Sequence, residues 1–394
     1  MPSVGVVGGS LGGLTAGLLL QELGCRVQIY ERSASELQAR GAGIAVLPAT
    51  WRYPVERLNV PADRFSSSTQ VIRFLTDDGS VECELDNPYL FSSWNAMYRV
   101  LRDGFETASP ASYHLGSEVV DIVDSGETAA AVMANGQVRE HDLVVCADGI
   151  TSPSRSRLLP DVAPEYSGYI AWRGVIPECE LSEETYDRLH DALTYQILDR
   201  SHILVYPIPH FDGSVEPGSR LMNIVWYRNV TDSDLDRTLT DVGGQRRAVS
   251  VPPGFVADDV VAEMRSYAAE HLCPAIAEVV TGIKEPFIQA VYDIDVPQMA
   301  FGRICLIGDA AFAVRPHAAA GTAKAAEDGW VLAEELRSAG GDVHLALDKW
   351  QKRQWELGRS LLDRTRRIGA SSQFDGTFKA GDPELIFGLY GPGA

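Results

Sequence analysis

Residues Val4–Gly24 read VGVVGGSLGGLTAGLLLQELG, and this stretch decides the fold. The apolar run Val4–Val7 predicts a buried strand, the glycines after it predict a tight turn, and the leucine-rich segment predicts a helix that ends at Gly24. Strand, glycine turn and helix in this order are the context that a dinucleotide-binding fingerprint requires. We therefore expect an α/β fold whose first helix points its N-terminus at a pyrophosphate group.

The residues of the turn have separate physical roles. Gly8 lets the chain turn sharply, and the missing side chain at Gly13 lets the helix pack close to the sheet. Ser10 stands where the fingerprint has its middle glycine, so either the backbone approaches the phosphate less closely or the serine hydroxyl takes part. A second predicted strand, Cys25–Tyr30, leads into Glu31, whose carboxylate can accept hydrogen bonds from ribose hydroxyls about 20 residues after the turn.

Two later segments place carboxylates at the ends of apolar strands. DLVVCADGITSPSRSRLL (142–159) has Asp148 and Gly149 directly after a predicted strand. GRICLIGDAAFAVRPHAAAGTAKA (302–325) has Asp309 after another, with a helix expected from near Thr322. Doubly wound sheets bind ligands at the carboxyl ends of their parallel strands. The three segments together predict one dinucleotide cofactor with a carboxylate on either side.

These three segments resemble those of the class A FAD-dependent aromatic hydroxylases, which have the p-hydroxybenzoate hydroxylase fold. The resemblance implies that Glu31 and the first segment bind the ADP half of FAD, and that Asp309 binds its ribityl chain. It implies that Asp148 serves both FAD and a nicotinamide reductant, NADH or NADPH, and that Arg99 in MYRVLRDGF also contacts FAD. In such enzymes reduced FAD captures O₂ as a C4a-hydroperoxyflavin, which hydroxylates an electron-rich ring. The cofactor-binding residues expected are Gly8, Ser10, Leu11, Gly13, Glu31, Arg32, Gly43, Arg99, Asp148, Gly149, Asp309, Pro316, Ala320 and Gly321.

Other segments resemble one group within that family, the dihydroxypyridine hydroxylases. These segments are SGYIAWRGVIP (167–177), LVYPIP (204–209), VWYRNV (225–230) and the tail GDPELIFGL (381–389). Phe312, Ala319 and Ala323 replace residues that the broader family prefers, and the group shares these departures. The resemblance implies hydroxylation of a small hydroxylated aromatic or N-heteroaromatic ring, with a dihydroxypyridine as the leading candidate, by a homodimer.

The expected architecture is a Rossmann-like FAD-binding domain interleaved with an antiparallel β-sheet substrate domain and followed by C-terminal helices. Residues 1–165 form the first part of the FAD domain, with inserted strands and a β-meander over residues 118–147. Residues 166–295 form mainly the substrate sheet, and residues 296–394 complete the FAD domain. The stretch from 345 to 368 has the spacing of one long amphipathic helix.

Composition excludes several other classes. A chain of 394 residues with 45% hydrophobic residues can build a substantial core, and its formal charge of −20 disfavours nucleic acid and anionic membrane surfaces. The six cysteines have no paired spacing, so we expect neither disulfides nor a metal site. The N-terminus lacks the basic region of a signal peptide, and no apolar run reaches the ~20 residues of a membrane span. We therefore expect a cytoplasmic protein.

Five residues are candidates for the cavity in which a ring would react: His317, Tyr206, His210, Tyr195 and Trp226. His317 precedes the helix that would face the flavin, so it either donates to flavin or substrate or bonds the loop backbone. His210 lies among proline and glycine, which also suits an exposed turn. Tyr206 either donates to a substrate oxygen or bonds the backbone as a core tyrosine. Arg173 either holds an anionic substrate or forms a structural ion pair.

Other functions share parts of this pattern. A nicotinamide-only dehydrogenase would explain the first segment but would leave Asp148 and Asp309 without a role. A flavin-dependent halogenase needs a tryptophan where Gly174 stands and a lysine soon after the first glycine motif, whereas the first lysine here is Lys284. Two readings stay open: a monooxygenase that hydroxylates, epoxidises or carries out Baeyer–Villiger insertion on a larger natural product, and a non-catalytic protein that binds flavin and an aromatic compound.

Overall fold

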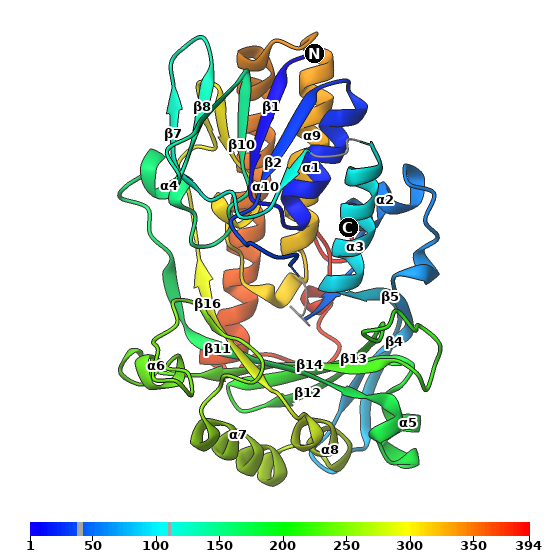
Figure 1. Cartoon of the computed structure of the whole chain (residues 1–394). Helices are drawn as coiled ribbons and strands as arrows, with labels where there is room; N and C mark the ends of the chain where they lie inside the picture. Colours follow the sequence, from blue (N-terminus) through cyan, green and yellow to red (C-terminus); the bar gives the residue numbers. More distant parts are fainter. Residues whose placement is uncertain (38–41, 109–111) are drawn as a thin grey trace.

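The computed structural model describes residues 1–37, 42–108 and 112–394. Two domains are stacked one on the other, and the N-terminus lies at the far end of the upper domain (Figure 1). The long helix α10 (Val343–Ala370) runs from the upper domain down to the sheet of the lower one. The α/β fold with a Rossmann-like FAD domain and a second sheet domain is confirmed.

The upper domain is built on a six-stranded sheet with the strand order β17-β18-β10-β1-β2-β6. Neighbouring strands pair in parallel, except β17 with β18. The strands are β1 (Ser3–Val7), β2 (Arg26–Tyr30), β6 (Tyr113–His114), β10 (Leu143–Cys146), β17 (Ala300–Phe301) and β18 (Ile304–Leu306). Strands from both halves of the chain therefore share one sheet, as an interleaved domain requires.

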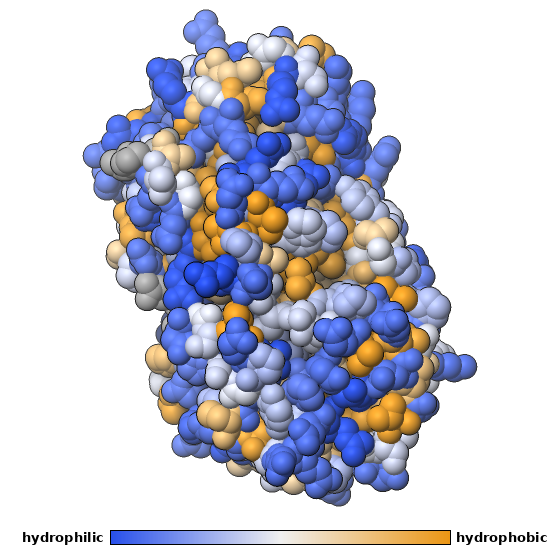
Figure 2. Space-filling model, turned by 90° about the vertical axis from the view of Figure 1, so that its right-hand side faces the viewer, coloured by the Kyte–Doolittle hydropathy of each residue, from blue (hydrophilic) through white to orange (hydrophobic). Residues whose placement is uncertain are grey.

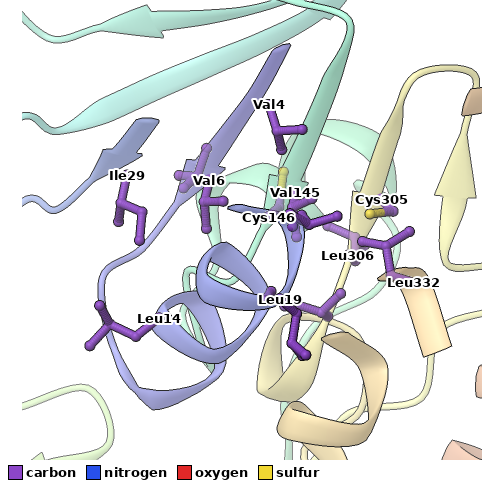
Figure 3. Packing of buried hydrophobic residues seen from close by; sticks show 14 of the residues in the cluster. Val4, Val6, Leu14, Leu19, Ile29, Val145, Cys146, Cys305, Leu306 and Leu332 are labelled. Atoms are coloured by element: carbon purple, nitrogen blue, oxygen red, sulfur yellow. The ribbon is translucent and has the colours of Figure 1, made fainter. Parts of the chain in front are cut away.

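Helices α1 (Leu11–Glu22) and α9 (Gly321–Ser338) cover one face of this sheet. Figure 3 shows the layer between them, where Val6 and Val145 from the strands meet Leu19 and Leu332 from the helices. Each of these side chains is buried, which contributes roughly 1.5–3 kcal/mol apiece. The helix α1 is apolar on most sides because the sheet, α9 and α3 (Trp94–Ala108) all pack against it.

A small antiparallel sheet lies beside the parallel one. Its strands are β7 (Val119–Asp124), β8 (Ala129–Met133) and β9 (Val138–His141). Gly126 and Gly136 have φ values of 86° and 82° in the two turns that join them. The β-meander predicted over residues 118–147 is confirmed.

The lower domain is a nine-stranded sheet with the order β15-β16-β11-β14-β13-β12-β4-β5-β3. Its strands are β3 (Gly43–Ala45), β4 (Ser67–Leu75), β5 (Val81–Ser93), β11 (Glu165–Pro177), β12 (Ala192–Leu198), β13 (Ser201–Ile208), β14 (Leu221–Asn229), β15 (Ser250–Val251) and β16 (Phe287–Asp293). Only the β12–β4 pair among these is parallel. The strands inserted before residue 165 therefore extend the substrate sheet rather than the FAD sheet.

Several helices went unpredicted from the sequence. They are α2 (Pro48–Glu56), α3, α4 (Pro153–Leu158), α5 (Glu183–Leu189), α6 (Asp232–Thr238), α7 (Asp258–His271) and α8 (Pro274–Gly282). Pro54 inside α2 hides its helical pattern, because proline normally breaks a helix interior. The helices α7 and α8 lie under the large sheet (Figure 1), so its other face is left for the FAD domain.

Within the described ranges, none of the helices has the length and apolar character to cross a membrane. The six cysteines are unpaired thiols, most of them buried. No group of histidine, cysteine and acidic side chains in those ranges is arranged to hold a metal ion.

Glycine contacts set the position of α1 against the sheet. Gly8 has a φ of 100°, and a Cβ added there would lie 2.4 Å from the carbonyl oxygen of Ala147. A Cβ added at Gly13 would lie 2.0 Å from the carbonyl oxygen of Gly8. Both contacts are with backbone, which cannot swing aside, so glycine is required at both positions.

We predict that Gly13→Ala lowers the melting temperature of the apoprotein, because the helix must move away from the turn to relieve the clash. The expected loss is about 1–3 kcal/mol of unfolding free energy. Gly321→Ala is the matched control, since a Cβ there meets nothing within 4 Å. Equal melting temperatures for Gly13→Ala and wild type would contradict the close approach.

Candidate active site

Two adjoining cavities lie at the carboxyl ends of the parallel strands. The smaller one, of about 220 Å³, includes Gly8, Glu31, Arg32 and Asp148 in its lining. The larger one, of about 400 Å³, includes Leu11, Gly43, Asp309, Pro316 and Gly321. Ser10, Ala147 and Gly149 line both cavities. The two cavities therefore form one elongated groove, which suits an extended dinucleotide.

Glu31 follows β2 and is hydrogen-bonded to the glycine turn that precedes α1. Its Oε2 accepts a hydrogen bond from the backbone N–H of Gly9 at 2.9 Å, and its Oε1 accepts one from the N–H of Ser33 at 2.9 Å. The side chain is buried, with 6% of its surface exposed. The carboxylate is thus fixed beside the turn, with its remaining lone pairs directed by these two bonds.

The N-terminus of α1 is open to the groove. Ser10 is the N-cap residue, but its side chain makes no capping hydrogen bond, and no acidic residue occupies the first turn. The first N–H groups of the helix therefore remain available to an anion, and the helix dipole favours one. Because the Ser10 hydroxyl has no partner in the described part of the chain and lines both cavities, it is free to contact a ligand.

Asp148 shapes its own turn. Its Oδ1 accepts a hydrogen bond from the Ser152 hydroxyl at 2.5 Å, and its Oδ2 accepts one from the N–H of Ser154 at 3.0 Å. Gly149 has a φ of 79°, and a Cβ there would meet nothing within 4 Å. The chain therefore presents open space beside Gly149, at the point where the two cavities join.

Asp309 lines the larger cavity, in a short 3₁₀ turn, Gly308–Ala310, that follows the neighbouring strand β18. Its side chain is exposed to the groove, but surrounding protein partly desolvates the carboxyl and raises its pKa, while Lys324 and Arg155 oppose that rise. A carboxylate in this position can accept hydrogen bonds from the hydroxyls of a ligand chain.

A buried ion pair supports the turn that carries Asp309. Nζ of Lys324 lies 2.7 Å from Oδ2 of Asp328, one helical turn along α9, and both side chains are at most 1% exposed. The same Oδ2 accepts a hydrogen bond from the N–H of Gly308 at 2.8 Å. Burial raises the pKa of Asp328, and the lysine opposes that rise. Lys324 thus supplies the charge that allows a carboxylate to hold the turn from inside the core.

The large sheet forms the wall of the groove furthest from the glycine turn. Arg173, Tyr206, Tyr227 and Gln289 are polar side chains of that wall, and Phe91 is an aromatic one. Trp94 at the start of α3 and Phe387 in the C-terminal tail add aromatic surface to the groove. The Tyr206 hydroxyl donates to the carbonyl of Gly43 at 3.2 Å, and its ring stacks on Phe91 with centroids 4.1 Å apart. The Tyr227 hydroxyl bonds to no described residue. This end of the groove therefore combines flat apolar surface with an unpaired hydroxyl.

Arg173 forms no ion pair with a described residue, so the structural ion pair considered from the sequence is not found. Its Nη2 donates to the carbonyl of Gly43 at 2.7 Å, and its Nη1 donates to Oε1 of Gln289 at 3.2 Å. The side chain is 8% exposed, and its guanidinium lines the groove.

His317 lies behind the groove rather than in its lining. Its Nε2 is 2.7 Å from the Tyr169 hydroxyl, and Nδ1 is buried with no partner in the described structure. Its ring lies 4.7 Å from Tyr227 and 5.4 Å from His202, measured between centroids. Burial holds the pKa of His317 well below its usual range, so the ring is neutral. The bond to loop backbone considered from the sequence is replaced by one to a tyrosine.

Three further candidates do not line the groove. Trp226 lies on the opposite face of the sheet, where its Nε1 donates to the Ser201 hydroxyl at 3.1 Å. Tyr195 is on the groove face but stacks on Phe74 under other side chains. His210 lies in a turn after β13 and lines a separate cavity. The expectation that these three surround the reacting ring is corrected accordingly.

Three expected cofactor-binding residues also lie outside the lining. Gly13 packs beneath the turn, and Ala320 is 1% exposed. Arg99 is exposed on α3 and lines the same separate cavity as His210. Trp94, the first residue of α3, lines the groove instead.

Comparison with known proteins identifies the family. A family model described as FAD binding domain-like matches residues 166–293. The 2,6-dihydroxypyridine 3-monooxygenase of Paenarthrobacter nicotinovorans is 35% identical over 395 residues, which cover 98% of this chain and 95% of that protein. The chain belongs to the FAD-dependent aromatic hydroxylases.

Other matches to this hydroxylase agree. The 6-hydroxynicotinate 3-monooxygenase of Pseudomonas fluorescens is 26% identical, with coverage of 87% of this chain and 84% of that one. The solved structure of 2,6-dihydroxypyridine-3-hydroxylase from Arthrobacter nicotinovorans superposes with a TM-score of 0.92 at 33% identity, covering 98% and 96% of the two chains. Klebsiella pneumoniae HpxO complexed with uric acid and FAD shares the fold, at 18% identity and a TM-score of 0.74 over 97% and 90% of the chains.

The groove of this hydroxylase fits FAD. The open N-terminus of α1 and the space beside Gly149 would suit its pyrophosphate, and the carboxylates of Glu31 and Asp309 would be able to accept hydrogen bonds from its ribose and ribityl hydroxyls. FAD, when bound, supplies the redox and oxygen chemistry of the reaction.

Sequence reasoning missed several residues of the site. Lys324 and Asp328 are spaced i, i+4 in the alanine-rich segment AKAAED, and two charges among small apolar residues are a signal of a buried pair. Tyr227 stands in VWYRNV next to Trp226, the residue that the sequence predicts for the cavity. Gln289 and Phe387 reach the groove from distant strands and the tail, and no local pattern marks them.

We predict that Lys324→Met destabilises the protein by about 3–5 kcal/mol, because it leaves the Asp328 carboxylate buried without a counter-charge. Adding Asp328→Asn should restore much of the loss, since the amide oxygen still accepts from Gly308. Thermal unfolding of both variants measures the difference. If Lys324→Met alone were as stable as wild type, the ion pair would not support the turn.

The buried histidines predict a loss of stability in acid. Burial lowers the pKa of His202 to about 3, whereas an unfolded chain has a histidine pKa of about 6.5. Between these values the unfolded state binds more protons, so stability is full above pH 6.5 and falls as the pH drops below it. His202 alone should cost on the order of 2 kcal/mol at pH 5 relative to pH 7.5.

The test compares melting temperatures at pH 7.5 and pH 5.0. His202→Gln should show a smaller acid-induced drop than wild type, while His344→Gln, at an exposed position, should show the wild-type drop. An unchanged drop in His202→Gln would mean that this ring is already protonated in the folded protein.

Proposed function

We propose that this hydroxylase uses NADH or NADPH and O₂ to add a hydroxyl group to a small hydroxylated N-heteroaromatic ring, with a dihydroxypyridine as the leading substrate. In the net reaction the reductant gives two electrons, one oxygen atom of O₂ enters the ring, and the other leaves as water. The observation that carries the proposal is 35% identity over the whole chain to a 2,6-dihydroxypyridine 3-monooxygenase, in a chain whose groove has a flat, aromatic end.

The groove supports a planar substrate of modest size. Its ring end, within a cavity of about 400 Å³, must hold both the flavin ring and the substrate, which leaves room for a small ring only. Phe91 and Tyr206 form a stacked pair in the wall, and Leu204 and Val225 add apolar surface beside it. A flat ring held face-on against such a wall is shielded from water, which protects reactive oxygen species from side reactions.

Polar groups of the wall suit an ionised hydroxypyridine. The Arg173 guanidinium favours a deprotonated ring hydroxyl, because its positive charge stabilises the anion. The Tyr227 hydroxyl and the side-chain amide of Gln289 can donate to ring oxygens or to the ring nitrogen. Ionisation makes the ring carbon more nucleophilic, so these residues orient the substrate and favour its reactive form. His317 packs against Tyr227 from behind the groove, with ring centroids 4.7 Å apart.

We also propose a homodimer and a cytoplasmic location. A homodimer is inferred from the resemblance to the family, and light scattering after size-exclusion chromatography tests it. A cytoplasmic location is supported by the six unpaired cysteines, because thiols persist in reducing compartments. A larger natural-product substrate is the second candidate, favoured by the separate cavity that adjoins the groove.

The deciding experiment follows oxidation of NADH and of NADPH by the purified holoprotein, with and without a panel of hydroxypyridines and phenols. We expect a dihydroxypyridine to stimulate oxidation and to gain one oxygen atom by mass. Yellow protein with no stimulation by any small ring would favour a larger substrate. Stimulated oxidation that yields only hydrogen peroxide would count against hydroxylation of that ring.

A further inference from the structure

A third cavity, of about 890 Å³, lies beside the groove and has no part in ring binding as proposed above. We call it the α3 cavity, because Tyr98 and Arg99 of that helix line one side of it. The turn that holds Phe211 and the segment that leads into β16 line other sides. Figure 2 shows the molecule from the side of α3, where hydrophobic side chains are gathered at mid-height between the two domains.

The α3 cavity continues the groove along one face of the large sheet. Phe287 lines the cavity and Gln289, two residues on in β16, lines the groove. Val175 and Arg173 in β11 stand in the same relation. Residues two apart in a strand point to the same face, so the two spaces are neighbours on one surface. Leu37 lines both the α3 cavity and the adenosine end of the groove.

The lining offers an exposed aromatic ring and an arginine that forms no ion pair with a described residue. Phe211 is 55% exposed, and the edge-to-face contact of its ring with His210, with centroids 5.7 Å apart, leaves much of the ring accessible from the cavity. Two acidic residues, Glu180 and Glu285, also line the cavity. Lys284 pairs with Glu180 at 2.8 Å, whereas Arg99 forms no ion pair with a described residue. An arginine with free donors is suited to phosphate oxygens, and an exposed phenyl ring is suited to stack on a base.

The net charge of the protein makes such an arginine significant. A chain with a formal charge of −20 repels a diphosphate at long range, so a dinucleotide needs a local unpaired cation to dock. The volume of the α3 cavity is also about twice that of the cavity in which the ring reacts, more than a small ring requires. An extended ligand with aromatic and anionic parts matches these features better than a second small ring does.

We propose that the α3 cavity binds the nicotinamide dinucleotide that reduces this enzyme, with Arg99 on its diphosphate and Phe211 against one of its rings. This rests on the proposed function. The dihydronicotinamide reaches the groove past Phe287 and gives a hydride, two electrons with one proton, to FAD; it leaves as the oxidised dinucleotide. Arg99 then serves the reductant rather than FAD.

The test measures the dissociation constant of NADH or NADPH, whichever reduces wild type, from the concentration dependence of anaerobic flavin reduction. Arg99→Glu should raise it about tenfold or more, because a charge-assisted contact becomes a repulsion, and Phe211→Ala should raise it less. FAD content and the dissociation constant of a dihydroxypyridine, read from the flavin spectrum, should stay at wild-type values. Arg64→Glu is the control, an exposed arginine outside the α3 cavity with the same change of charge.

Three results would overturn the assignment. The first is an unchanged dinucleotide dissociation constant in Arg99→Glu. The second is weakened dihydroxypyridine binding in either variant, which would make the cavity part of a larger substrate site. The third is loss of FAD from Arg99→Glu. If neither dinucleotide reduces the wild-type flavin, the proposed function itself fails, and this result is distinct from the other three.

Discussion

The parallel register of the six-stranded sheet is the constraint on which the site depends. Val7 is paired with Tyr30 on one side and with Cys146 on the other, and Cys146 is paired with Leu306. Four strands thus end at the same level, so the residues that follow them meet at one edge. The glycine turn, Glu31, Asp148 and the turn of Asp309 come together for this reason alone, although the chain separates them by up to about three hundred residues.

The N-terminal and strand-end motifs were predictable because each rests on local chemistry. A glycine that packs against a backbone oxygen, or a carboxylate that directly follows an apolar strand, can be recognised from the few residues around it. The strands of the large sheet were predictable, but which of their side chains face the groove was not. Trp226 and Tyr227 are adjacent in β14, and strand geometry sends them to opposite sides; only the pairing with β13 and β11 decides which one meets the groove.

What the sequence could not supply are contacts between distant elements. Arg99 and Trp94 share α3, and the packing of that helix, not its composition, directs the tryptophan to the groove and the arginine to the α3 cavity. Phe387 enters the groove because Arg364 holds the tail through three backbone carbonyls. The Lys324–Asp328 pair supports the turn of Asp309 only because Asp328 also accepts a hydrogen bond from the N–H of Gly308. In each case the partner lies in another part of the chain.

The most direct test of this account is a crystal structure of the holoprotein with a dihydroxypyridine bound. We expect FAD to run from Glu31 past Gly149 to Asp309, with its ring near the sheet wall and the substrate beside Arg173 and Tyr227. A flavin that bypasses Glu31 and Asp309, or a substrate bound away from the Arg173 face of the sheet, would contradict it.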